Sequence, residues 1–470
     1  MTGLDSSHPD LAGDTMIHHY KLAGYNIVLD VASGSIHNVD SVAYDAILLF
    51  EQVSKEELVK RIMSDYPKIT LEEVTELLSE IEELKKQGKL FSNDDYTQIA
   101  SYMRAGLPLK ALCLNVSHMC NMSCSYCFAA HGKYGGEDEL MSLDTGKRAI
   151  DFLIENSPGR EYLDVDFFGG EPLLNWDVVK EIVVYARKRE QGSGKRFRFT
   201  LTTNTLLIDD DVISFTNKEM HNVVLSLDGR PSINDGARKL PNGSGSYAAV
   251  VPNIEKIVHA RGGKGYYIRG TYTRENLDFV NDILHIADLG FTMLSMEPVV
   301  AKPGTPYALK SDDIPILLEQ YEALAKEMLT REKEGRGFTF YHYMLDLTKG
   351  PCVYKRIAGC GVGTEYLAVT PSGQLYPCHQ FIGDERFLMG DLWVGGMTNQ
   401  KQRELFAGRD IYSRSECKTC WARFYCSGGC AANAHNATGS INGVYSLECE
   451  LFKKRVECAI MLKVSEEVGS

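Results

Sequence analysis

The cysteines of this chain are distributed very unevenly, and their placement constrains the fold more than any other feature. Of the 13 cysteines, none lies in the first 112 residues, four lie between Cys113 and Cys127, and nine lie from Cys352 onward. Three of the first group form a Cys120-x3-Cys124-x2-Cys127 loop directly after an apolar stretch. Thiols at such short spacing are typical of metal sites, whereas unrelated structural thiols would not gather in two distant groups. We therefore expect two metal-binding regions.

Composition indicates a soluble, acidic protein. The 470 residues, 44% of them hydrophobic, suffice for about two to four domains. The formal net charge of −13 argues against a phosphate backbone as the main partner, so we expect no nucleic acid. No apolar signal segment or stretch of roughly 18 apolar residues is present, so we expect no membrane partner and a cytoplasmic location. In that reducing compartment, cysteines serve as metal ligands rather than disulfides.

Four regions follow one another along the chain. Residues 14–95 contain an alternating stretch with Ser-Gly in its middle, which predicts a hairpin, and then two amphipathic helical segments. Residues 108–310 alternate apolar strands with helical segments, which predicts an α/β fold with a parallel sheet and crossover helices. Residues 311–350 predict a charged connector helix, and 351–460 are rich in cysteines and turns, as in segments held together by metal.

The first cysteine loop offers three thiolates, whereas a 4Fe–4S cluster takes four ligands. One iron would then accept a ligand from outside the protein. The spacing, with the aromatic Tyr126 before the last cysteine, resembles the radical SAM superfamily, in which S-adenosylmethionine (SAM) fills that position. The resemblance implies that residues 108–310 form a partial (β/α)6 barrel. It also implies that Cys120, Cys124 and Cys127 are the catalytic cluster ligands, and that Tyr126 and Phe128 lie at the cofactor. The bound cofactors would generate a 5′-deoxyadenosyl radical. A zinc site or three unrelated buried thiols is the alternative.

Further motifs of the same superfamily fall at the ends of successive predicted strands, where α/β sheets carry their chemistry. The turn Gly169-Gly170-Glu171-Pro172 follows the next strand, and glycine lets a backbone approach a ligand closely. The resemblance implies that this turn binds the SAM amino group. Thr205 replaces the glycine of the family's Thr-Asn-Gly turn. Four more residues are implied to contact SAM: Asn204, Ser226, Asp228 and Arg238. For Ser226 and Asp228 a plain turn after a strand is the alternative.

The C-terminal cysteines resemble a second family pattern, the SPASM domain of radical SAM enzymes that modify peptides. Its seven cysteines match Cys360, Cys378, Cys417, Cys420, Cys426, Cys430 and Cys449. The resemblance implies two auxiliary 4Fe–4S clusters, and therefore three clusters in all. The outer cluster would take Cys417, Cys420, Cys426 and Cys449, and the inner one Cys360, Cys378 and Cys430. Cys352 is the candidate fourth inner ligand; alternatively, that iron stays open for a substrate thiolate. Zinc is again the alternative metal.

The N-terminal unit resembles the RiPP recognition element, a winged-helix-like domain that binds the leader of a ribosomally made precursor peptide as an added strand. A structural cap is the alternative, and the helices are too acidic for DNA binding. The whole chain resembles most closely the maturases of SCIFF peptides (six cysteines in forty-five residues). The resemblance implies a sactipeptide-type oxidoreductase that joins a cysteine sulfur to a backbone α-carbon, supplied with electrons by a donor such as flavodoxin or ferredoxin. The other hypotheses are a different radical SAM peptide modification, such as sulfatase formylglycine maturation, epimerisation or carbon–carbon bonding, and a non-catalytic iron–sulfur or zinc regulator.

Overall fold

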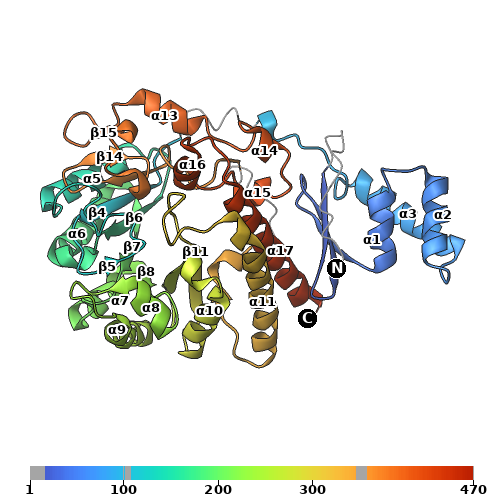
Figure 1. Cartoon of the computed structure of the whole chain (residues 1–470). Coiled ribbons are helices and arrows are strands. Elements are labelled where there is room, and N and C mark those ends of the chain that lie inside the picture. Colours follow the sequence, from blue (N-terminus) through green and yellow to red (C-terminus); the bar gives the residue numbers. More distant parts are fainter. Residues whose placement is uncertain (1–15, 99, 101–106, 346–356, 469–470) are drawn as a thin grey trace.

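A ten-stranded, mostly parallel sheet forms the centre of the molecule in the computed structural model, which describes residues 16–98, 100, 107–345 and 357–468 (Figure 1). Six parallel strands stand side by side in chain order: β4 (Ala111–Ser117), β6 (Tyr162–Gly169), β7 (Arg196–Thr203), β8 (Met220–Ser226), β10 (Tyr266–Tyr272) and β11 (Met293–Pro298). The predicted alternation of strands and helices, and the parallel sheet, are therefore confirmed.

The connecting helices lie on the outside of this sheet (Figure 1). They are α5 (Leu143–Glu155), α6 (Trp176–Ser193), α7 (Asp210–Glu219), α8 (Pro231–Ala237), α9 (Tyr247–Ala260) and α10 (Phe279–Asp288). Local sequence fixes where several of them begin. Ser142 accepts a hydrogen bond from the Thr145 N–H at the start of α5, and Asp209 accepts one from the Val212 N–H at the start of α7. Such caps satisfy donors that the first helical turn leaves unpaired.

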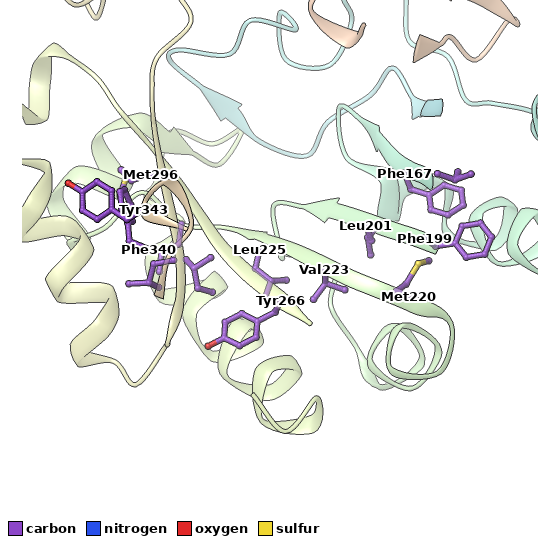
Figure 2. Packing of buried hydrophobic residues seen from close by; sticks show 14 of the residues in the cluster. Phe167, Phe199, Leu201, Met220, Val223, Leu225, Tyr266, Met296, Phe340 and Tyr343 are labelled. Carbon is purple, nitrogen blue, oxygen red and sulfur yellow. The ribbon is translucent and has the colours of Figure 1, made fainter. Parts of the chain in front are cut away.

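Alternation along the strands separates an apolar layer from a polar face. On β6, Leu163, Val165 and Phe167 are fully buried, while Asp164 and Asp166 point to the other face. Phe167 stacks on Phe199 of β7 with ring centroids 5.8 Å apart, and Figure 2 shows this layer continuing across β8 and β10. Each buried side chain of this size contributes roughly 1.5–3 kcal/mol. This layer holds the sheet to its helices and leaves the opposite face for polar groups.

The C-terminal region extends the same sheet. β13 (Tyr366–Val369) pairs in parallel with β4, and the antiparallel strands β14 (Gln374–Tyr376) and β15 (Gly390–Asp391) follow it. At the opposite edge, β12 (Thr339–Phe340) pairs with β11. The sequence predicted a separate region from residue 351. Its first strands instead cover the edge of β4, where unpaired backbone groups would otherwise be left.

Helices dominate the rest of the C-terminal half. They are α11 (Ile314–Lys333), α13 (Gln400–Ala407), α14 (Ser415–Lys418), α15 (Arg423–Cys426), α16 (Ala431–Thr438) and α17 (Ser446–Val468). The predicted connector helix corresponds to α11, and it packs along α17 (Figure 1). Tyr321 on α11 is fully buried and interacts with Arg455 on α17. None of the described helices is both long and apolar enough to cross a membrane.

The N-terminal unit is a three-stranded antiparallel sheet with three helices. Its elements are β1 (Ile17–Leu22), β2 (Tyr25–Asp30), β3 (Ile36–Val39), α1 (Ser41–Leu49), α2 (Lys55–Asp65) and α3 (Leu71–Lys86). The predicted hairpin is β2–β3. Sequence reasoning missed β1, because its two histidines interrupt the apolar alternation. It also missed α2 as a separate helix, because only Leu58 and Ile62 of that helix are buried.

The N-terminal unit contacts the C-terminal region directly (Figure 1). His18 on β1 lies 3.0 Å from the Glu457 carboxylate on α17, and its ring stacks on Trp421 at 3.6 Å between centroids. Arg423 on α15 pairs with Asp94 at 3.0 Å. The unit is therefore joined to the segment that carries Cys417 to Cys430.

Candidate metal centre

The first cysteine loop begins where β4 ends, and a short ribbon anchors its middle. Within it, β5 (Ser123–Cys124) pairs antiparallel with β9 (Arg238–Lys239), which places Cys124 opposite Arg238. The Ser125 N–H also donates to the Ala237 carbonyl at 2.9 Å. Two segments far apart in sequence are thus tied together at the cysteines.

The three thiols of this loop influence one another electrostatically. Burial, together with the charges of Glu171, Cys124 and Cys127, raises the pKa of Cys120 to about 12. Burial also raises the pKa of Cys124, against the lowering effect of Arg238. Without a cation, the thiols would hold their protons. Iron ions would stabilise the thiolates and release those protons, so this donor set fits a thiolate-ligated cluster.

Tyr126, Asp228 and Arg238 form one buried polar unit. The Tyr126 hydroxyl donates to Asp228 Oδ2 at 2.6 Å and accepts from Arg238 Nη1 at 3.0 Å. Asp228 Oδ1 accepts from the Thr271 N–H on β10 at 3.0 Å, and Arg238 Nη1 lies 3.9 Å away. These three residues, which were predicted to contact SAM, therefore also hold the cysteine loop against the ends of β8 and β10.

Gly169 and Gly170 are required because the cysteine loop passes directly over them. A Cβ on Gly169, at φ +134°, would lie 2.3 Å from the Ser117 oxygen, and one on Gly170 would lie 2.1 Å from the Met119 oxygen. The Gly170 N–H donates to the Ser117 carbonyl at 2.7 Å, and the Glu171 N–H donates to the Met119 carbonyl at 2.8 Å. The glycines thus allow two backbones to touch.

The Glu171 carboxylate joins this turn to the end of β7. It is fully buried and accepts hydrogen bonds from the Leu173 N–H at 3.0 Å, the Thr203 hydroxyl at 2.8 Å and the Asn204 N–H at 2.7 Å. Burial raises its pKa, although these donors favour the ionised form. Pro172 starts the short helix η1 (Pro172–Asn175) after the turn.

Asn204 faces the cysteine loop itself. Its Nδ2 donates to Asn121 Oδ1 at 2.7 Å and lies 3.8 Å from Cys120 Sγ. The following residue, Thr205, has φ +71°, a conformation that favours glycine, and its buried hydroxyl has no partner among the described residues. Ser226 ends β8 beside Arg269 of β10. Sequence reasoning missed Asn121, which no motif marks. It included Thr203 in the turn that resembles Thr-Asn-Gly but gave its side chain no role.

The C-terminal cysteines influence one another electrostatically in two groups. The pKa of Cys378 is raised well above its usual range by burial first and then by Cys430 and Cys360. Burial also raises the pKa of Cys449 to about 12, with Cys420 and Cys417 among the charges that add to it. Burial likewise raises the pKa of Cys426 to about 12, and the charges of Cys449, Cys420 and Cys417 contribute to that rise. Cys352 lies outside the described residues.

Two cysteines lie outside the predicted ligand sets, and the possible ligands among the described residues are too far apart for a single metal ion. Cys113 on β4 and Cys458 on α17 are buried, as expected of packing residues. In the described ranges, no three His, Cys, Asp or Glu side chains are close enough to hold a single metal ion. A cubane cluster distributes its thiolates over four irons and so takes ligands that are farther apart.

An aromatic contact links the first loop to the inner C-terminal group. Phe128, next to Cys127, lies 5.5 Å from the His379 ring, and His379 directly follows Cys378. Phe168 at the end of β6 approaches the same ring at 4.7 Å. Burial, with a smaller contribution from the charge of Arg269, lowers the pKa of His379 to about 4. Sequence reasoning missed His379, although its place directly after a predicted ligand could have drawn attention to it.

Comparisons with known proteins agree with this geometry. The radical SAM superfamily model matches residues 114–284. The chain is 21% identical to the radical SAM cyclopropyl synthase TigE of Paramaledivibacter caminithermalis over 89% of each chain. It is 23% identical to the serine-type anaerobic sulfatase-maturating enzyme of Klebsiella aerogenes, covering 73% of this chain and 84% of that one. Streptococcus suis SuiB, solved with its precursor peptide SuiA, shares the fold with a TM-score of 0.51 at 16% identity, over 92% and 98% of the two chains. Residues 114–284 therefore constitute a radical SAM domain.

Proposed function

We propose that this protein is a radical SAM enzyme that forms a thioether in a ribosomally made, cysteine-rich precursor peptide. One observation carries the proposal: the Phe128–His379 contact joins the first cysteine loop to the group of Cys360, Cys378 and Cys430. A peptide residue between these two groups would be within reach of both.

Cys120, Cys124 and Cys127 would hold the SAM-cleaving 4Fe–4S cluster, and the other two groups would hold the auxiliary clusters. When bound, these cofactors supply a 5′-deoxyadenosyl radical that takes a hydrogen atom from the peptide α-carbon, and an acceptor for the electron released when the sulfur–carbon bond forms. Cys352 is the proposed fourth ligand of the inner cluster, with an open iron as the alternative.

The residues around the first loop would bind and orient SAM. Gly169 and Gly170 keep the turn against the loop, and Glu171 fixes the end of β7, where Asn204 faces Cys120. The Tyr126–Asp228–Arg238 unit would place polar groups beside the cofactor, with Ser226 at the neighbouring strand end and Phe128 and Pro172 at its margins. Because these side chains are held by one another, they would lose little freedom on binding.

The N-terminal unit would bind the leader of the precursor. β3 is an edge strand that pairs only with β2 among the described strands, so it can accept an added strand. The likeness to SuiB, which was solved with a precursor peptide, covers 92% of this chain and so includes at least part of this unit. A flavodoxin or ferredoxin would supply the electrons.

SAM cleavage and iron content test the proposal that this protein is a radical SAM enzyme. Anaerobically reconstituted, dithionite-reduced protein should convert SAM to 5′-deoxyadenosine. Replacing Cys120, Cys124 and Cys127 with alanine should abolish this conversion and lower the iron content from about twelve to about eight atoms per chain. Zinc in place of iron, or no 5′-deoxyadenosine, would overturn the proposal.

The chemistry is tested on the peptide product. A co-expressed cysteine-rich precursor should lose two hydrogens, and the linked sulfur should resist thiol alkylation in mass spectrometry. Sulfatase formylglycine maturation is the second candidate, favoured by the likeness to a sulfatase-maturating enzyme over 73% of this chain. Oxidation of a sulfatase peptide, with cysteine-rich peptides left unchanged, would select that candidate instead.

A further inference from the structure

The N-terminal unit rests on two pieces of the C-terminal region, which are the loop that carries α14 and α15 and the helix α17. His18 on β1 contacts both pieces. Its ring stacks on Trp421 of the loop at 3.6 Å between centroids, with the ring planes 2° apart, and its Nε2 lies 3.0 Å from the Glu457 carboxylate of α17. The Tyr20 hydroxyl also donates to the Glu457 carbonyl at 2.9 Å. A single strand of the unit thus spans the loop and the helix.

A second contact joins the chain after α3 to the same loop. Asp94 accepts hydrogen bonds from Arg423 at 3.0 Å and from the Tyr412 hydroxyl at 2.7 Å. The Tyr96 ring meets Phe424 edge-on at 5.5 Å between centroids. Arg423 and Phe424 are buried, and both lie between cysteines of the loop. The position of the N-terminal unit therefore depends on the conformation of this loop.

The proposed outer ligands lie in the same two pieces, three in the loop and one in the first turn of α17: Cys417, Cys420, Cys426 and Cys449. The helices α14 and α15 have four residues each, too few for a helix that is stable on its own. Small segments of this kind take their fold from bound metal. A metal centre on these four thiols would cross-link the loop to α17, and would hold together the two pieces that His18 spans.

We infer that the outer metal centre is a structural clamp, which holds the α14–α15 loop against α17 and thereby fixes the N-terminal unit on the rest of the protein. The inference rests on the proposed function only in assigning a metal to the four outer cysteines. The unit has a core of its own, in which Val28, Leu58 and Ile62 are buried. Ile27 and Leu29, on the other face of its sheet, pack on the main core. Loss of the outer metal therefore loosens the contacts of His18 and leaves the unit folded.

The test measures the accessibility of His18 in the full-length, anaerobically reconstituted protein. Its side chain is only 12% exposed, because Trp421 covers the ring. In the C417A/C420A double variant, labelling of His18 by diethyl pyrocarbonate, followed by mass spectrometry, should be about fivefold faster. His37 on β3, which lies outside these contacts, serves as the internal reference and should keep its rate. The matched control C120A/C124A, which removes two cysteines of the first loop, should change the His18 rate less than about twofold.

A second variant, which keeps every cysteine, tests the clamp even if C417A/C420A fails to fold. H18A/D94A removes the contacts from the N-terminal side, and should release about a third of the bound metal to a chelator about fivefold faster, because the loop is uncovered. H37A/D65A, with both changes on the same unit outside the contacts, should match the wild type.

Three results would overturn the inference: equal labelling of His18 in the two cysteine variants, faster labelling of His37 as well, or equal metal release from the two N-terminal variants. Zinc at the four outer cysteines would refute the proposed function, whereas the clamp would act with either metal. Because no measurement needs SAM or a reductant, absent 5′-deoxyadenosine would likewise refute the proposed function and leave the clamp standing.

Discussion

Replacing Gly170 with alanine should disrupt the packing of the cysteine loop on its neighbouring turn. The added Cβ would lie 2.1 Å from the Met119 oxygen and 3.0 Å from the Gly132 Cα, where ordinary contacts begin at 3.4 Å. Both partners are backbone atoms, so neither can rotate away as a flexible side chain would. The turn and the loop must separate by about 1 Å, which strains the hydrogen bond from the Gly170 N–H to Ser117.

The expected cost combines overpacking, roughly 1–3 kcal/mol, with one or two weakened hydrogen bonds of about 1 kcal/mol each. A loss of about 4 kcal/mol is a large share of the roughly 5–15 kcal/mol that stabilises a typical domain. Urea denaturation followed by circular dichroism measures it. Gly236, where a Cβ meets no atom within 4 Å, supplies the control, and Gly236→Ala should change the unfolding free energy by about 1 kcal/mol or less. An unfolding free energy of the Gly170→Ala variant within about 1 kcal/mol of the wild-type value would refute this prediction.

Three further predictions concern other buried groups. Thr205→Val should raise the unfolding free energy by about 1 kcal/mol, because the hydroxyl it removes is buried without a partner. Thr203→Val should lower it by roughly 1–2 kcal/mol, because it removes a donor to Glu171; the same sign for both variants in urea denaturation would contradict the assignment. Burial lowers the pKa of His342 to about 4, below its usual 6.5, so the folded state binds fewer protons and stability should fall as the pH drops below 6.5. His342→Asn should reduce that loss by up to about 1.4 kcal/mol per pH unit, and an unchanged pH profile of unfolding would count against it.

The local parts of the site could be read from the sequence. Cys120, Cys124 and Cys127 lie within one short loop, so their spacing alone indicates a shared metal centre. The strands before these cysteines and before Gly169 could also be predicted, because an apolar run followed by a turn is a pattern of adjacent residues. The parallel sheet followed from the alternation of strands and helices, since parallel strands need crossover connections.

Only the tertiary structure decided which distant residues meet. Three contacts join segments whose distance along the chain gives no sequence signal. Cys124 pairs with Arg238, Glu171 accepts a hydrogen bond at the end of β7, and Phe128 contacts His379. The glycines of the turn, expected to admit a ligand, also prove necessary because a second backbone passes over them. β13 joins β4 because a partial sheet leaves an edge to be covered. Sequence thus determined the chemistry of each segment, through side-chain type and local spacing. The fold decided which segments share a site, because that depends on packing between residues far apart along the chain.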